Sequence, residues 1–175
     1  PTRELAMQIF DVLRVVGKQH DLSAGLVIGG KDKNEEAERI TRMSLLVCTP
    51  GRLLQHLDET VGCDASSLQV LVIDEADRIL EIGFEEDMRS IIKCLPKKGR
   101  QTALFSATQT KNVADLARLA IEHKPVYVAA QQSAANSTVS TLEQGFVVCE
   151  ASSPQRVGRA LAQLDDSAPC ARLAA

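Results

Sequence analysis

The sequence lacks the excess of basic residues that is typical of proteins binding nucleic acid through a broad charged surface. It holds 20 Lys and Arg against 23 Asp and Glu, which gives a formal net charge of −3 at pH 7. Bulk electrostatics therefore gives no reason to expect a nucleic acid as a ligand. If one binds, specific loops have to hold it.

Paired cysteines and membrane-spanning segments are also missing. The five cysteines stand at positions 48, 63, 94, 149 and 170, none of them in a C-x-x-C pair. This odd, scattered set argues against a zinc site and a disulfide framework, and favours reduced thiols used as small apolar side chains. No apolar stretch is long enough to span a membrane, and no signal peptide is present. Because the chain begins at proline, we expect the natural N-terminus to lie upstream.

What is present is a globular composition with strands and helices in alternation. The 175 residues, 45% hydrophobic and 25% charged, suffice for one domain with a sizeable core. Apolar runs predict strands at 24–28, 45–48, 68–73, 102–105, 126–129 and 142–149, and helical periodicity predicts helices at 2–18, 32–43, 50–57, 84–95 and 110–120. This alternation predicts a parallel α/β sheet covered by helices and joined by right-handed crossovers. A small, polar stretch after residue 130 predicts a linker, and from residue 151 the composition shifts to a divergent tail.

The apolar run Val70–Ile73 ends at a carboxylate pair, Asp74 and Glu75. An uninterrupted run of this kind predicts a strand buried on both faces of a parallel sheet. Ligand sites in open α/β sheets lie beyond the carboxyl ends of such strands. The two carboxylates therefore suit a hard cation, Mg²⁺ carrying phosphate. Taken alone, they fit equally well as caps of the helix that starts near Arg78.

Two further strand ends carry residues suited to a phosphate. Glycines at Gly29-Gly30 let backbone N–H groups approach a ligand closely, although an ordinary strand-to-helix turn is the alternative. Thr49-Pro50-Gly51-Arg52 places N–H groups, a hydroxyl and a guanidinium at a helix N-terminus. A lone arginine at such a position is more often a solvated surface charge.

Five motifs follow one another in a fixed order: Pro-Thr-Arg-Glu-Leu-Ala at 1–6, Gly-Gly at 29–30, Thr-Pro-Gly-Arg at 49–52, Asp-Glu-Ala-Asp at 74–77 and Ser-Ala-Thr at 106–108. Chance accounts for one tetrapeptide but not for five ordered matches. With this order and spacing, residues 1 to 150 resemble the first RecA-like domain of the DEAD-box RNA helicases. The resemblance implies a RecA-like parallel sheet with helices on both faces, covering residues 1–130 and lacking the strand of the phosphate loop. It also implies that residues 131–150 lead toward a second RecA-like domain.

The resemblance implies a role for each residue of the Asp-Glu-Ala-Asp and Ser-Ala-Thr motifs that carries a polar side chain. Asp74 is expected to hold the Mg²⁺ of ATP through water, and Glu75 to position or activate the attacking water. Phosphoryl transfer relies mostly on such positioning and charge neutralisation. Asp77 is expected to pair with Ser106 and Thr108 in a network that couples hydrolysis to strand separation.

The other three motifs line the RNA backbone in the family that the chain resembles. Phosphate and 2′-OH contacts carry no base information, so recognition is expected to be largely independent of RNA sequence. The amino-acid sequence at 29–32, 36–40 and 48–60 resembles that of a ribosome-biogenesis subgroup of the family. This implies pre-ribosomal RNA as substrate, a role in rRNA processing and a nucleolar location. The expected RNA contacts fall on Thr2, Arg3, Gly29, Gly30, Thr49, Gly51 and Arg52.

Several family motifs do not occur in the chain. It contains no G-x-x-x-x-G-K-[ST] phosphate loop, which we expect to precede residue 1, and neither the adenine-reading glutamine motif nor the second domain with its arginine finger. We therefore expect a fragment that alone binds ATP negligibly, has no helicase activity and tends to aggregate. Two other functions stay open, a non-catalytic RNA-binding or scaffold module without an ATP site and a DNA translocase. The Ala76-Asp77 ending and the Thr-Pro-Gly-Arg wording favour RNA over DNA.

Overall fold

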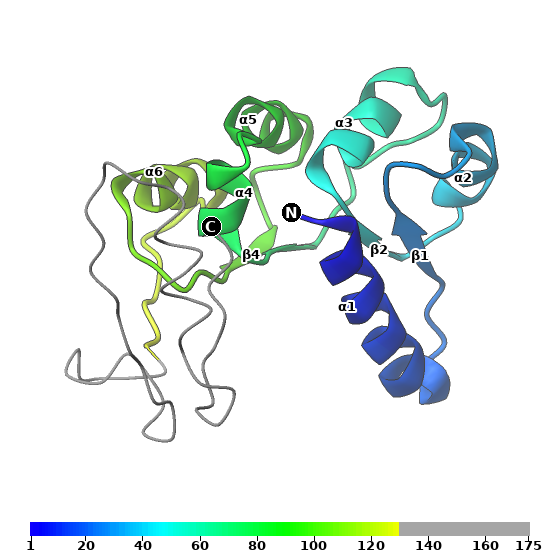
Figure 1. Cartoon of the computed structure of the whole chain (residues 1–175), viewed down its shortest axis with the longest axis horizontal. Helices are drawn as coiled ribbons and strands as arrows, with labels where there is room; N and C mark the ends of the chain where they lie inside the picture. The colour runs from blue at the N-terminus through cyan, green and yellow to red at the C-terminus, as the bar shows by residue number, and fades with distance from the viewer. Residues whose placement is uncertain (130–175) are drawn as a thin grey trace, which may run out of the picture. The chain divides into compact units, whose positions relative to one another are not determined.

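The computed structural model describes residues 1–129 (Figure 1). The chain divides into a first unit, Pro1–Val126, and a second unit, Tyr127–Ala175, and the fold given below is that of the first unit. The expected linker and strand at 131–150 and the expected tail at 151–175 lie outside the described residues, as do Cys149 and Cys170.

The first unit alternates strands and helices, as the sequence predicts up to residue 120. One prediction is wrong: residues 126–129 form no strand. The helix that the sequence analysis starts near Arg78 is the short helix α4, which precedes α5. The elements are α1 (Arg3–Val16), the 3-10 turn η1 (Gly17–Gln19), β1 (Ala24–Val27), α2 (Lys33–Ile40), β2 (Leu45–Cys48), α3 (Pro50–Glu59), β3 (Val70–Ile73), α4 (Ala76–Glu81), α5 (Glu85–Cys94), β4 (Gln101–Leu104) and α6 (Lys111–Ala120).

The starts of the helices follow from capping residues in the sequence. Thr2, Asp32 and Thr110 precede α1, α2 and α6, and their side chains accept a backbone N–H of the first turn over 3.3, 2.8 and 3.3 Å. These bonds satisfy donors that have no partner within the helix. Pro50 stands at the start of α3, where its missing N–H costs no hydrogen bond. No helix among the described residues is both long and apolar enough to cross a membrane.

All strand pairings in the described residues are parallel. β1 pairs with β2, with Ala24 opposite Leu45, and β3 pairs with β4, with Val70 opposite Gln101. These pairs form two separate two-stranded sheets, since β2 and β3 exchange no ladder hydrogen bonds. The expected single sheet is therefore not formed by the described part of the chain.

The strand β3 is covered on one face only, which corrects the prediction of a strand buried on both faces. Ile73 is 3% exposed and Leu71 is half-buried, whereas Val70 and Val72 on the opposite face are 55% and 58% exposed. Successive side chains of a strand point to opposite faces. An apolar run therefore predicts cover on both faces, but the described residues supply it on one.

The main core lies between the second sheet and the helices α4, α5 and α6. Its centre includes Ile73, Met88, Ile91, Ile92 and Leu116, with Phe84 packed partly buried against it. This confirms the prediction that Phe84 and Met88 serve the core. α3 packs against α5, while α1 contacts both strands of the first sheet (Figure 1).

Candidate functional site

Six of the seven residues expected to contact RNA line one cavity of about 490 Å³. They come from the start of α1, the turn after β1 and the start of α3. Gln55, Ile82 and Phe84 complete part of the wall. Because parallel strands end at the same edge of a sheet, segments far apart in sequence meet here. The six residues are Thr2, Arg3, Gly29, Thr49, Gly51 and Arg52.

The seventh residue, Gly30, adjoins Arg3 at the edge of this group. Its φ is +88°, a left-handed conformation that favours glycine. The Arg3 Nη1 atom lies 2.8 Å from the position that a Cβ of residue 30 would occupy. Gly30 therefore has one structural reason to be glycine, its backbone conformation, since the flexible Arg3 guanidinium can move away from a Cβ.

Thr49 joins the end of β2 to the start of α3. Its N–H donates to the Val27 carbonyl over 3.1 Å, and its carbonyl accepts the Leu53 N–H over 3.0 Å. The residue is 7% exposed, and within the described residues its hydroxyl makes no hydrogen bond. Since Thr49 lines the cavity, this hydroxyl is free to bond a ligand there.

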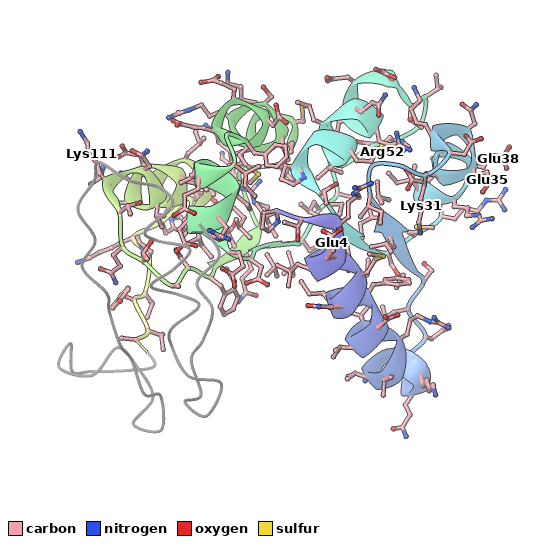
Figure 2. The ribbon with its side chains drawn as sticks, viewed as in Figure 1. Glu4, Lys31, Glu35, Glu38, Arg52 and Lys111 are labelled. Carbon is pink, nitrogen blue, oxygen red and sulfur yellow. The ribbon has the colours of Figure 1, made fainter. Side chains whose placement is uncertain are left out.

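Arg52 is held by three hydrogen bonds instead of extending freely into solvent. Its Nε donates to Glu36 Oε2 over 2.7 Å, its Nη1 donates to Gln55 Oε1 over 2.9 Å, and its Nη2 donates to the Lys31 carbonyl. The side chain is 10% exposed. Figure 2 shows Arg52 between α3 and α2, whereas Glu35 and Glu38 lie on the outer side of α2. The alternative interpretation of Arg52 as a solvated surface charge is therefore wrong.

The Glu36 carboxylate is buried beneath Arg52. Its Oε2 also bonds His56 Nε2 over 3.0 Å, and its Oε1 accepts the Ile28 N–H over 3.3 Å. Burial by itself raises the pKa of Glu36, but the hydrogen bonds from His56, Arg52 and Ile28 outweigh it and leave that pKa below its usual range. Glu36 therefore stays ionised near neutral pH.

Sequence reasoning missed Glu36 and His56, although one signal for Glu36 was present. Glu36 stands four residues before Ile40, so both side chains lie on the same face of α2. An acid on the apolar face of an amphipathic helix indicates a buried partner. His56 gave no comparable signal, and it is 0% exposed, with its Nδ1 2.8 Å from the Thr60 hydroxyl.

Asp74 and Glu75 lie at the carboxyl end of β3, and both are half-buried. Asp74 Oδ1 accepts the Glu75 N–H over 3.0 Å. Among the described residues, Glu75 is the single non-glycine with positive φ, at 52°. A left-handed residue that is not glycine costs about 1–2 kcal/mol, and such strain gathers at functional sites.

The two carboxylates meet one requirement of a magnesium site. They offer the hard oxygen ligands that Mg²⁺ prefers. The described residues contain no group of three His, Cys, Asp or Glu side chains able to hold a metal by themselves. The pair therefore fits an ion that brings waters and phosphate oxygens to complete its shell.

Asp77 connects the start of α4 to the loop after β4. Its Oδ2 accepts both the N–H and the hydroxyl of Thr108, over 3.1 and 2.9 Å, and its Oδ1 accepts the Arg78 N–H over 3.0 Å. The Thr108 hydroxyl is the main reason that the pKa of Asp77 lies below its usual range. The Ser106 hydroxyl donates to the Thr108 carbonyl over 2.9 Å. The structure thus brings these three residues together, with Thr108 at the centre.

The profile of the DEAD/DEAH box helicase family matches residues 1–116, more than half of the chain. The chain belongs to this family. The human "Probable ATP-dependent RNA helicase DDX10" is 63% identical over 150 residues, 86% of this chain and 17% of that protein. The "ATP-dependent RNA helicase dbp4" of Aspergillus oryzae is 60% identical over 148 residues, 85% of this chain and 18% of that protein. The chain therefore spans less than a fifth of the length of these two relatives.

Solved structures of the family show the same fold. A DEAD box protein from the hyperthermophile Methanococcus jannaschii superposes with a TM-score of 0.63 and 31% sequence identity, over 67% of this chain and 32% of that one. This DEAD/DEAH box chain is thus an α/β protein with parallel strands like those of its relatives.

The described cysteines of this DEAD/DEAH box chain differ in exposure: Cys48 and Cys63 are half-buried, and Cys94 is exposed. Cys48, Cys63 and Cys94 are free thiols, so the described residues hold no disulfide. Burial raises the pKa of Cys48 to about 11. A thiol with so high a pKa is protonated near neutral pH and therefore a poor nucleophile.

Proposed function

We propose that the chain is the part of an ATP-dependent RNA helicase that binds RNA and carries the acidic residues for ATP hydrolysis. One observation carries the proposal: six residues from three separate motifs line the same cavity. The cavity combines the guanidiniums of Arg3 and Arg52, the free hydroxyl of Thr49 and the N-terminus of α3. These groups are donors suited to backbone phosphates and 2′-hydroxyls. RNA binding is then largely independent of base sequence.

ATP hydrolysis is the second part of the proposal, and it rests on the acids after β3. Asp74 would hold Mg²⁺ through water, and Glu75 would position the attacking water. When bound, Mg²⁺ supplies neutralisation of phosphate charge. Glu75 is the N-cap of α4 and has a left-handed (αL) backbone. This backbone conformation fixes the direction in which its side chain leaves the chain. Asp77, Ser106 and Thr108 would transmit the state of this site to the RNA.

The remaining parts of the site are proposed to lie outside this chain. A phosphate loop would precede residue 1, and a second RecA-like domain with an arginine finger would follow. This agrees with the small share of the relatives that the chain covers. The chain alone is then expected to bind ATP negligibly.

We place the process in ribosome biogenesis, with pre-ribosomal RNA as substrate and the nucleolus as location. The support is the amino-acid sequence around the Gly-Gly and Thr-Pro-Gly-Arg motifs, which resembles that of a ribosome-biogenesis subgroup. Imaging of the tagged full-length protein measures nucleolar localisation, and cross-linking to RNA in cells measures binding to pre-rRNA.

The proposal is tested in the full-length protein by ATPase and RNA-binding assays. Arg3→Ala is expected to weaken RNA binding evenly across RNA sequences, because a phosphate contact carries no base information. Arg14→Ala is the matched control, since Arg14 is an exposed arginine of the same helix outside the cavity. Glu75→Gln is expected to abolish hydrolysis and to leave ATP binding largely intact. RNA affinity unchanged by Arg3→Ala, or a full-length protein that binds RNA but not ATP, contradicts the proposal; the latter favours a non-catalytic RNA-binding module.

A further inference from the structure

The guanidinium of Arg52 is only partly used by the protein. Arginine has five N–H donors in a fixed planar fork. Three of them bond to Glu36, Gln55 and Lys31, one from each nitrogen. One N–H on Nη1 and one on Nη2 remain, and Arg52 lines the cavity. These two N–H groups can donate to the oxygens of a phosphate.

A single carboxylate fixes the direction of this fork. Glu36 Oε2 bonds the Nε of Arg52, and Oε1 bonds the N–H of Ile28, the residue just before Gly29. Glu36 therefore ties the Thr-Pro-Gly-Arg helix to the Gly-Gly turn. The buried His56, which is 0% exposed, bonds Glu36 Oε2 through its Nε2 and the Thr60 hydroxyl through its Nδ1.

We propose that Glu36 is a positioning residue for RNA binding. It holds Arg52 so that the two remaining N–H groups bind one backbone phosphate in the cavity, and it holds the Gly-Gly turn in register beside it. The inference rests on the proposed RNA-binding function. Glu36 touches no RNA in this arrangement and acts through Arg52 and Ile28.

The substitution Glu36→Gln removes this alignment with little change in volume. An amide has one acceptor oxygen, whereas the Glu36 carboxylate uses both of its oxygens as acceptors. The amide NH₂ must therefore face a donor, either the Ile28 N–H or the Arg52 Nε–H. Glu35→Gln is the matched control, because Glu35 is the exposed residue directly before Glu36 in the same helix.

The first test is a double-mutant cycle on RNA affinity in the full-length protein. The probe is a single-stranded oligonucleotide of mixed sequence. Glu36→Gln is expected to weaken binding about tenfold, whereas in an Arg52→Ala background it adds less than about twofold, because the residue it positions is gone. Glu35→Gln is expected to leave affinity unchanged in both backgrounds. Equal losses in the two backgrounds overturn the proposal.

A second measurement needs no RNA and separates failure of the inference from failure of the proposed function. The Nε–H of Arg52 is expected to give a slowly exchanging NMR signal in the protein, which Glu36→Gln abolishes and Glu35→Gln retains. A fast-exchanging Nε–H in the unsubstituted protein overturns the positioning role, whatever binds the cavity. If the Arg52 Nε–H exchanges slowly but the protein binds no RNA, the proposed function is refuted, and so is a phosphate as the ligand of Arg52. The role of Glu36 in orienting the Arg52 guanidinium would still hold in that case. General unfolding in Glu36→Gln, seen as loss of cooperative melting, also counts against the inference.

Discussion

The bond between Asp77 and Thr108 gives a quantitative prediction about the loop after β4. Two donors of Thr108 converge on Asp77 Oδ2, the N–H at 3.1 Å and the hydroxyl at 2.9 Å. Asp77 is 5% exposed, whereas Thr108 is exposed. The perturbation is Thr108→Val, which removes the hydroxyl and keeps both the shape and the backbone N–H.

The magnitude follows from the charge and the exposure of the pair. A hydrogen bond to a charged group contributes about 1.5–3 kcal/mol, and water competing at the exposed Thr108 lowers this to about 1–1.5 kcal/mol. Asp77→Asn costs more, about 2–3 kcal/mol, because the amide NH₂ must face either the Arg78 N–H or the Thr108 N–H. Since both substitutions disrupt the same contact, their effects are expected to be less than additive by about 1 kcal/mol.

Hydrogen exchange of the residue-108 amide in the full-length protein measures how much each substitution destabilises the loop after β4. The N–H stays in all variants, and its exchange rate reports the free energy of opening the loop. Thr108→Val is expected to speed exchange roughly five- to tenfold, since 1.4 kcal/mol corresponds to a factor of ten. Ser66→Ala is the control, because its hydroxyl bonds an aspartate, Asp64, in a different loop. Strictly additive effects of Asp77→Asn and Thr108→Val would refute the reasoning.

The same contact fixes the sign of the pH dependence. The pKa of Asp77 lies below its unfolded value of about 3.9, chiefly because the Thr108 hydroxyl bonds the charged form. As the pH falls, the unfolded or open loop takes up a proton first. The stabilisation is therefore complete above about pH 4 and is lost as the pH falls through the lowered pKa of Asp77. Protection of the residue-108 amide that stays constant as the pH falls from 5 through the lowered pKa of Asp77 would contradict this.

Two other predictions concern ligand approach and coupling. Gly29→Ala is expected to preserve the melting temperature and to weaken RNA binding several-fold. Gly30→Ala is expected to destabilise the fold by about 1–2 kcal/mol because of its positive φ. Unchanged RNA affinity in Gly29→Ala would count against RNA in the cavity. Replacing Ser106 and Thr108 together by Ala in the full-length protein is expected to spare much of the ATPase while lowering unwinding, and equal loss of both activities would contradict the coupling role.

Local features of the fold could be predicted from the sequence because their causes are local. The caps Thr2, Asp32 and Thr110 each act within three residues of their own position. Apolar runs likewise fixed β1 to β4 within one or two residues at each end. The split into two sheets and the bare face with Val70 and Val72 depend on which chain segments cover a strand, and an apolar run carries no such information.

The candidate site divides in the same way. Residues at strand ends were predictable, because topology brings strand ends to one edge. The bond from Arg52 to Glu36 spans sixteen positions and the contact of Glu36 with His56 spans twenty, so neither leaves a periodic signal. The sequence therefore placed Arg52 either as an RNA contact or as a solvated surface charge, whereas the structure shows it held by a buried carboxylate.

The glycines of the cavity separate what the fold needs from what a ligand needs. Gly30 has a positive φ, so its backbone conformation alone explains it. Gly29 has open space around its Cβ position, and at Gly51 a Cβ would meet Asp87 at 3.4 Å and Phe84 at 3.7 Å, which is ordinary contact. Alanine in a helix is favoured over glycine by about 1 kcal/mol, so packing and propensity both allow alanine at position 51. Near this position the first N–H groups of α3 have no partner within the helix. A side chain there would stand between those N–H groups and a phosphate entering the cavity. Under the proposed RNA-binding function, we therefore propose that glycine at 29 and 51 serves the close approach of that ligand to the backbone.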